Sequence, residues 1–256
     1  MISDQQVEFF QTFGFLPLRE AFSADEMTAI GDTFDDMLVK DREGRPFPGE
    51  TRQALYGIAE RNPLLADLAQ DDRIYSTVER LLGPGFHWLC SEGNLYVGET
   101  EWHPDGSRLN FPPMKVSLYL DALTRNTGCL RVIPGSHRLP LHEALRPIEK
   151  LGVPGTDVPC HFLESNPGDV LFLNMNIWHA AYGGAVGRRH LALNFVPEAT
   201  EPEHVELMKT NHRTLINLME RFQYSRPGRA FTDDFLNSER PRIRRMASKW
   251  VELGLQ

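Results

Sequence analysis

The feature that most limits how this chain can fold is a change in the period of its apolar residues near residue 86. From there to residue 196, short segments show the two-residue alternation of strands, and turns containing Gly or Pro separate them. The seven segments cover residues 86–90, 94–97, 114–121, 129–133, 158–163, 170–174 and 190–196. Because no helical pattern interrupts them, we predict a mainly β fold, an antiparallel sandwich or jelly roll.

Helical spacing precedes and follows the strand region. Capping-box patterns begin at Ser3 and Ser23, and another helix is expected around residues 62–82. Helical spacing returns after the strands and ends in a basic helix over about 241–253. We therefore predict one domain over residues 1–256, with a helical N-terminal part (1–85), a jelly-roll core (about 86–198) and C-terminal helices (199–256).

Composition narrows the class of partner. The net charge of −8 gives no basic surface for nucleic acid, and no apolar run is long enough to span a membrane. The Arg-rich run at 240–245 is more typical of a solvated helix face than of a partner site. Three cysteines without C-x-x-C spacing indicate neither a disulfide framework nor a thiolate zinc site. We expect a cytoplasmic protein that acts on a small molecule.

Two histidines and one aspartate have the spacing of a metal site. His103 and Asp105 are two residues apart, so on an extended backbone both side chains leave the same face. His179 would supply a second imidazole from a distant segment. Two His and one carboxylate that leave other positions open are the ligand set of non-haem Fe(II) oxygenases. Taken alone, residues 103–106 could equally form a turn.

Four further motifs accompany this spacing. They are Asn126–His137 (NTGCLRVIPGSH), Pro167-Gly168-Asp169, Trp178-His179 followed by Gly183-Gly184, and Arg188-Arg189. Together with Trp102-His103-Pro104-Asp105, they make the chain resemble the phytanoyl-CoA dioxygenase-like family of Fe(II)/2-oxoglutarate oxygenases, from about residue 14 to 196. The resemblance implies a double-stranded β-helix, a cupin-like jelly roll. It also implies that His103, Asp105 and His179 bind Fe(II), with 2-oxoglutarate and O₂ as cosubstrates.

The resemblance also places an arginine of the last core strand on the distal carboxylate of 2-oxoglutarate. The two candidates are Arg188 and Arg189, and the strand alternation favours Arg188. Family members often have a Ser where this chain has Ala181, which leaves the other cosubstrate contacts open. On the polar face of segment 114–121, Lys115, Ser117 and Tyr119 are candidates for such contacts by position.

The reaction implied by the resemblance is hydroxylation of a C–H bond, with release of succinate and CO₂. Related halogenases have a small residue in place of the carboxylate ligand, so Asp105 favours hydroxylation over halogenation. Desaturation, cyclisation or epimerisation by the same oxidant remains an alternative. So do a jelly-roll binding protein without catalysis and a zinc hydrolase that uses the same three ligands.

The sequence says less about the substrate. Trp102, Phe111 and Met175 are candidates for an apolar wall. Candidates for binding an anionic group are Arg108, Arg125 and Arg131, of which Arg131 stands out on an otherwise apolar strand. For each, the ordinary alternative is a core aromatic or a solvated arginine. A lid is expected at 40–49 or 105–113. The substrate and the oligomeric state stay undetermined.

Overall fold

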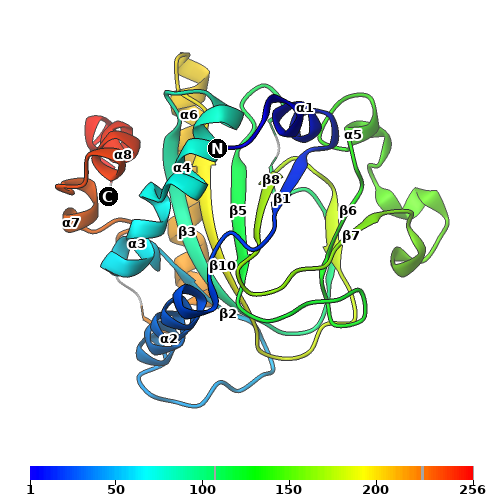
Figure 1. Ribbon diagram of the computed structural model, residues 1–256, viewed down its shortest axis with the longest axis horizontal. Helices are drawn as coiled ribbons and strands as arrows, with labels where there is room; N and C mark the ends of the chain where they lie inside the picture. The colour runs from blue at the N-terminus through cyan, green and yellow to red at the C-terminus, as the bar shows by residue number, and fades with distance from the viewer. Residues whose placement is uncertain (107, 226–227, 256) are drawn as a thin grey trace.

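The alternating segments form two antiparallel sheets in the computed structural model of the chain, which describes residues 1–106, 108–225 and 228–255 (Figure 1). The larger sheet has the order β1 (Phe15–Leu18), β8 (Val170–Asn174), β5 (Met114–Tyr119), β10 (Arg188–Val196), β3 (His87–Tyr96) and β2 (Gln53–Tyr56). The smaller sheet has the order β4 (Thr100–His103), β9 (His179–Ala181), β6 (Leu130–Val132) and β7 (His161–Leu163). The predicted mainly β jelly roll is therefore confirmed.

Helices flank the sheets at both ends of the chain. The α-helices are α1 (Asp4–Phe13), α2 (Ala24–Asp41), α3 (Pro63–Gln70), α4 (Asp72–Leu82), α5 (Leu141–Ala144), α6 (Pro202–Phe222), α7 (Asp233–Leu236) and α8 (Pro241–Leu253). Short 3₁₀ helices lie at Ala59–Arg61, Ile148–Leu151 and Gly155–Asp157. Both predicted capping boxes, at Ser3 and Ser23, are present. Among the described residues, no helix combines the length and apolarity that crossing a membrane requires.

Several elements differ from the sequence expectation. Segments 86–90 and 94–97 form one strand, β3, which pairs along its length with β10. The helix expected at 62–82 is interrupted at Asp71, whose carboxylate caps the start of α4 by accepting from the amide of Arg73. The N-terminal part contributes β1, where the sequence predicts a short strand over residues 14–18, and also an unexpected strand, β2; these two form the edges of the larger sheet. Its strands and the core strands thus form one sheet.

The larger sheet has one face covered by helices and the other turned toward the smaller sheet (Figure 1). The helix-covered face is apolar. The other face is polar along β3, β5 and β10 but apolar at β1 and β8, where Phe15, Leu171 and Leu173 pack with the smaller sheet. Along β10, Leu191, Leu193 and Phe195 belong to the helix-covered core. The alternate residues Arg188 and His190 therefore point between the two sheets. This alternation produces a polar interior in an otherwise apolar fold.

The Arg-rich segment of α8 docks the helix onto the N-terminal part of the chain. Arg240 pairs with Asp67 at 2.7 Å, and Arg242 pairs with Asp72 at 2.6 Å. Arg245 lies over the rings of Tyr75 and Phe86. The run is therefore neither wholly solvated nor free for a partner, because several of its arginines make contacts within the chain.

Candidate metal centre and its cavity

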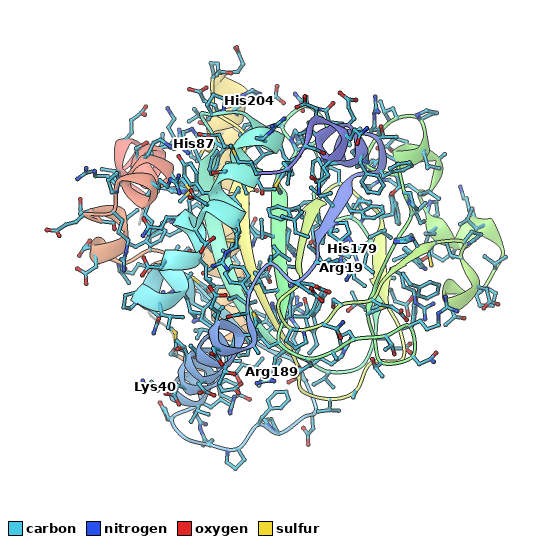
Figure 2. All side chains as sticks on the ribbon, in the orientation of Figure 1. Arg19, Lys40, His87, His179, Arg189 and His204 are labelled. Atoms are coloured by element: carbon cyan, nitrogen blue, oxygen red, sulfur yellow. The ribbon has the colours of Figure 1, made fainter. Side chains whose placement is uncertain are left out.

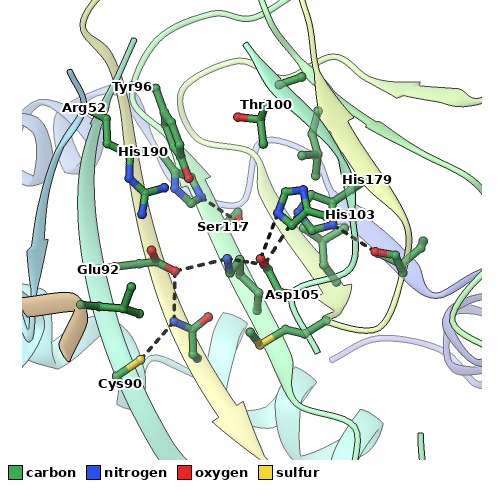
Figure 3. A pocket seen from close by; sticks show the side chains of 18 of the residues that line it. Arg52, Cys90, Glu92, Tyr96, Thr100, His103, Asp105, Ser117, His179 and His190 are labelled. Carbon is green, nitrogen blue, oxygen red and sulfur yellow. Dashed lines mark hydrogen bonds and ion pairs between the residues drawn. The ribbon is translucent and has the colours of Figure 1, made fainter. Parts of the chain in front are cut away.

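Strand pairing brings the two candidate histidines together. His103 ends β4 and His179 begins β9, and the two residues are directly opposite each other in the antiparallel pair. Asp105 follows His103 after one proline. Its Oδ1 lies 3.4 Å from His103 Nε2, and its Oδ2 lies 3.7 Å from His179 Nε2. One ligand atom from each of the three residues lies within 4.8 Å of the others, so one ion could contact all three (Figure 3).

Backbone carbonyls fix the orientation of both imidazoles. His103 Nδ1 lies 2.7 Å from the carbonyl oxygen of Glu101, and His179 Nδ1 lies 3.0 Å from that of Ile177. Each contact assigns the proton to Nδ1, which donates to the carbonyl and leaves the Nε2 lone pair directed at the shared position. Burial lowers the pKa of His179 to about 4, so this imidazole is neutral and able to ligate.

A buried cation keeps the third ligand ionised. Lys115 Nζ lies 2.6 Å from Asp105 Oδ2 and 3.2 Å from Glu92 Oε1. Burial alone would raise the pKa of Asp105, but the charge of Lys115 holds it well below its usual range. Two imidazole lone pairs and a carboxylate directed at one position therefore fit a divalent iron ion, whose preferred donors include both types.

A cavity of about 400 Å³ opens beside this centre, between the two sheets. The polar faces of β5 and β10 form one wall, through Lys115, Ser117, Tyr119, Arg188, His190 and Asn194. Met175 also lines it, as the sequence suggested. Helix α6 contributes Asn211, Thr214, Leu215 and Leu218, a contribution that the sequence did not reveal. A volume of this size suits a small-molecule site.

The two adjacent arginines have different surroundings. Arg188 lines the cavity and is only 7% exposed. Its guanidinium donates to the backbone carbonyls of Gly98, Gly128 and Ala185, and in the described part of the chain it makes no ion pair. Arg189 points to the opposite face, where it pairs with carboxylates of Asp121 at 2.7 Å and Asp35 at 2.9 Å. Figure 2 shows Arg189 beside α2, away from His179.

Three residues predicted as substrate contacts do not line the cavity in the part of the chain that the structure describes. Trp102 donates its indole N–H to the carbonyl of Gly155 at 2.8 Å, within a separate apolar cluster. Phe111 stacks on His204. Arg131 is buried on the other side of β6, because its neighbour Leu130 takes the cavity-facing position. For these three the structure corrects the expectation.

The structure also locates the two remaining arginine candidates and one of the two segments expected to form a lid. Arg108 and Arg125 do not line the cavity either, in the residues described. In segment 105–113, one of the two expected lids, two of the described residues are bonded to the residues that follow β8: the amide of Gly106 donates to the carbonyl of Met175 at 2.7 Å, and Asn176 Nδ2 donates to the carbonyl of Arg108 at 3.0 Å.

Sequence reasoning missed the cavity residues of β2 and β3. Glu92 and Tyr96 on β3, with Arg52 and Tyr56 at β2, all line the cavity. On β3, Glu92 falls between the two predicted segments and follows another polar residue, Ser91, so strict alternation did not mark it. On β2 all four residues are buried, so no alternation marks that strand either.

Comparison with known proteins shows which family the chain resembles in sequence and which solved structures share its fold. Residues 10–189 match the family model described as phytanoyl-CoA dioxygenase (PhyH). An ectoine dioxygenase from Sphingopyxis alaskensis is 28% identical over 218 residues, 71% of each chain. Among solved structures, HygX from Streptomyces hygroscopicus with nickel and 2-oxoglutarate bound superposes with a TM-score of 0.63 at 20% identity, covering 78% of this chain and 88% of that one. EctD from S. alaskensis with bound Fe gives 0.62 at 24% identity, covering 77% of each.

Proposed function

The chain belongs to the phytanoyl-CoA dioxygenase family of Fe(II)/2-oxoglutarate-dependent oxygenases, and on that premise we propose that His103, Asp105 and His179 hold its iron. The observation that carries this proposal is the convergence of their ligand atoms within 4.8 Å beside a cavity of about 400 Å³. We propose hydroxylation of a C–H bond of a small molecule as the reaction, with succinate and CO₂ as the other products. Desaturation, cyclisation or epimerisation would use the same centre.

Iron with 2-oxoglutarate and O₂ supplies the oxidising chemistry, and the protein supplies orientation and shielding. The carbonyls of Glu101 and Ile177 hold the two imidazoles in the tautomer that can ligate. Lys115 keeps Asp105 ionised, and this ion pair favours a supporting role for Lys115 over a direct cosubstrate contact. The burial of His179 and Asp105 between the sheets limits the access of bulk water to their side of the centre.

Arg188 is the residue that we propose for the distal carboxylate of 2-oxoglutarate. It is a buried guanidinium in the cavity whose hydrogen bonds go to carbonyl oxygens, and it has no ion-pair partner among the described residues. A carboxylate would supply such a partner through a bidentate contact. Tyr119 also lines the cavity, and its hydroxyl is a candidate for a second contact where Ala181 offers none.

Anaerobic titration of the apo-protein with Fe(II) and 2-oxoglutarate tests the proposal. We expect a visible metal-to-ligand charge-transfer band, which His179→Ala abolishes because it removes one of three protein ligands. His161→Ala, at an exposed histidine on β7, is the matched control and should keep the band. Well-folded protein without a band would favour a non-catalytic binding protein. Turnover with zinc alone and without O₂ would favour the hydrolase.

Gly184→Ala is expected to weaken 2-oxoglutarate binding about tenfold or more while iron binding stays unchanged. A Cβ at this position would overlap the guanidinium of Arg188, which must then leave its present place. Losing a charge-assisted hydrogen bond costs about 1.5–3 kcal/mol, which corresponds to such a factor. Calorimetric titration of the metal-loaded protein with 2-oxoglutarate measures the change.

The matched control is Gly31→Ala, since a Cβ there meets nothing closer than 3.8 Å. This position lies within α2, where Ala is favoured over Gly, so the control should bind 2-oxoglutarate normally and unfold no more easily. Unchanged 2-oxoglutarate affinity in Gly184→Ala would contradict the placement of the cosubstrate at Arg188.

A further inference from the structure

A second arginine in the cavity also lacks a charge partner. Arg52, immediately before β2, lines the cavity, and its Nη2 donates to the hydroxyl of Tyr56 at 3.1 Å. Its Nε is buried and has no hydrogen-bond partner among the described residues. In the same part of the chain, no carboxylate forms an ion pair with it. A buried donor of this kind costs free energy unless an ordered water or a ligand satisfies it.

Aromatic rings hold this guanidinium in place. Its central carbon lies 4.6 Å from the ring centre of Phe222 on α6 and 5.5 Å from that of Tyr96 on β3. These contacts come from two different elements, and Tyr56 adds a hydrogen bond from β2. A fixed guanidinium loses little further freedom when it binds an anion, which favours recognition over a surface role.

The charges that line the cavity do not balance. Its cations are Arg52, Lys115 and Arg188, and its carboxylates are Glu92 and Asp105. Lys115 contacts both carboxylates directly, whereas Glu92 acts on Arg52 only from beyond ion-pair distance. On the proposed function, a divalent iron and the dianion 2-oxoglutarate add no net charge, and the cosubstrate occupies Arg188. One positive charge then remains in the cavity, and it lies at Arg52.

We propose that Arg52 binds a carboxylate of the primary substrate, and therefore that the enzyme acts on small monocarboxylates. This inference rests on the proposed function, since it assigns the rest of the cavity to iron and 2-oxoglutarate. A single excess charge matches a carboxylate better than a phosphate monoester, which carries nearly two at neutral pH. In Figure 3 Arg52 lies across the cavity from His103 and His179, so the carboxylate would be held away from the oxidised carbon.

The other residues that line the cavity are consistent with a substrate that has a carboxylate at one end and a carbon skeleton at the other. Leu89, Leu215 and Leu218 offer apolar surface to a carbon skeleton. The three arginines proposed from the sequence for an anionic group of the substrate, Arg108, Arg125 and Arg131, do not line the cavity in the described residues, whereas Arg52 does. The anion site is thus supplied by a short edge strand and a C-terminal helix, outside the motifs that carry the iron site.

Calorimetric titration with three probes of one chain length tests the inference. The protein is loaded anaerobically with Fe(II) and saturating 2-oxoglutarate, and the visible band is recorded before hexanoate, hexanamide or hexyl phosphate is added. We expect hexanoate to bind about tenfold or more tightly than hexanamide, the factor typical of a hydrogen bond to a charged group. Arg52→Met should abolish this preference, and Arg52→Lys should keep part of it. Arg45→Met, at an exposed arginine over the ring of Tyr224, should bind like the unmodified protein.

Several outcomes would overturn the inference. They are no hexanoate binding, equal binding of hexanoate and hexanamide, a preference that survives in Arg52→Met, displacement of 2-oxoglutarate by hexanoate, and tighter binding of hexyl phosphate. The visible band distinguishes a failure of the proposed iron and 2-oxoglutarate site from a failure of the proposed carboxylate site at Arg52. Its absence counts against the metal site, whereas a normal band without carboxylate preference counts against Arg52 alone.

Discussion

Arg188→Met is expected to weaken 2-oxoglutarate binding about thirtyfold or more, whereas Arg189→Met should leave it unchanged. Arg188 lines the cavity without a carboxylate partner, so truncation would leave the distal carboxylate of the cosubstrate buried and unpaired. Losing one member of such a charge pair costs about 2–5 kcal/mol. The dissociation constant of 2-oxoglutarate, measured by calorimetry on metal-loaded protein, gives the factor directly.

Arg189→Met is a matched control because it removes the same charge from the next residue of the same strand. Arg189 joins β10 to Asp121 and Asp35 in partly exposed ion pairs, so its loss should lower the free energy of unfolding by about 1 kcal/mol or less per pair. Denaturant unfolding of both variants separates the two roles. If Arg189→Met lost 2-oxoglutarate and Arg188→Met kept it, the two assignments would have to be exchanged.

This pair of residues also shows what the sequence could predict. Strand alternation puts adjacent side chains on opposite faces, and the apolar residues Leu191, Leu193 and Phe195 identify the face that packs on the helices. The sequence therefore separates Arg188 from Arg189 without a structure. The same reasoning places Lys115, Ser117 and Tyr119 in the cavity, because β5 alternates as strictly.

Alternation fails where both faces of a strand are buried. On β6, Leu130 lines the cavity and Arg131 packs on the other side, with its charge over the rings of Phe162 and Tyr182. The sequence suggested instead that Arg131 faces the cavity, because an arginine on an otherwise apolar strand was interpreted as a ligand-binding group. The structure shows Arg131 held by two aromatic rings and by the carbonyl of Thr156, with its Nε left without a hydrogen-bond partner among the described residues. No local pattern in the sequence distinguishes such an arginine from one that lines the cavity, as Arg52 does.

The cavity residues that no sequence motif predicted belong to segments far from the motifs in the sequence. Arg52 is next to a strand whose four residues are all buried, and α6 begins after the last core strand. Their place against the cavity depends on packing: β2 pairs with β3, and α6 contacts β2. Sequence motifs thus predict the proposed metal centre, whose two histidines lie opposite each other on paired strands, with Asp105 two residues after His103. They do not predict the proposed substrate side, which is made by tertiary contacts.

Trp88→Ala is expected to lower the free energy of unfolding by about 3–5 kcal/mol, a large share of the about 5–15 kcal/mol typical of a whole protein. Trp88 lies on β3, and its side chain is fully buried. The same strand places Glu92 and Tyr96 in the wall of the cavity. The ring of Trp88 meets Phe195 edge-on at 5.2 Å, and its indole N–H donates to Glu60 Oε1 at 2.9 Å. Urea unfolding measures the loss.

Trp88→Phe divides this effect between packing and hydrogen bonding. Phenylalanine keeps an aromatic ring in the cavity left by alanine but cannot donate to Glu60, a fully buried carboxyl whose pKa burial raises. We expect a loss of about 1–3 kcal/mol for the missing donor, well below that of Trp88→Ala. Equal losses would show that the hydrogen bond dominates, and a loss in Trp88→Ala below about 1 kcal/mol would contradict the central place of this residue in the core. Since β3 lines the cavity and pairs with β10, both variants should also weaken the binding of cavity ligands in proportion to the unfolded fraction.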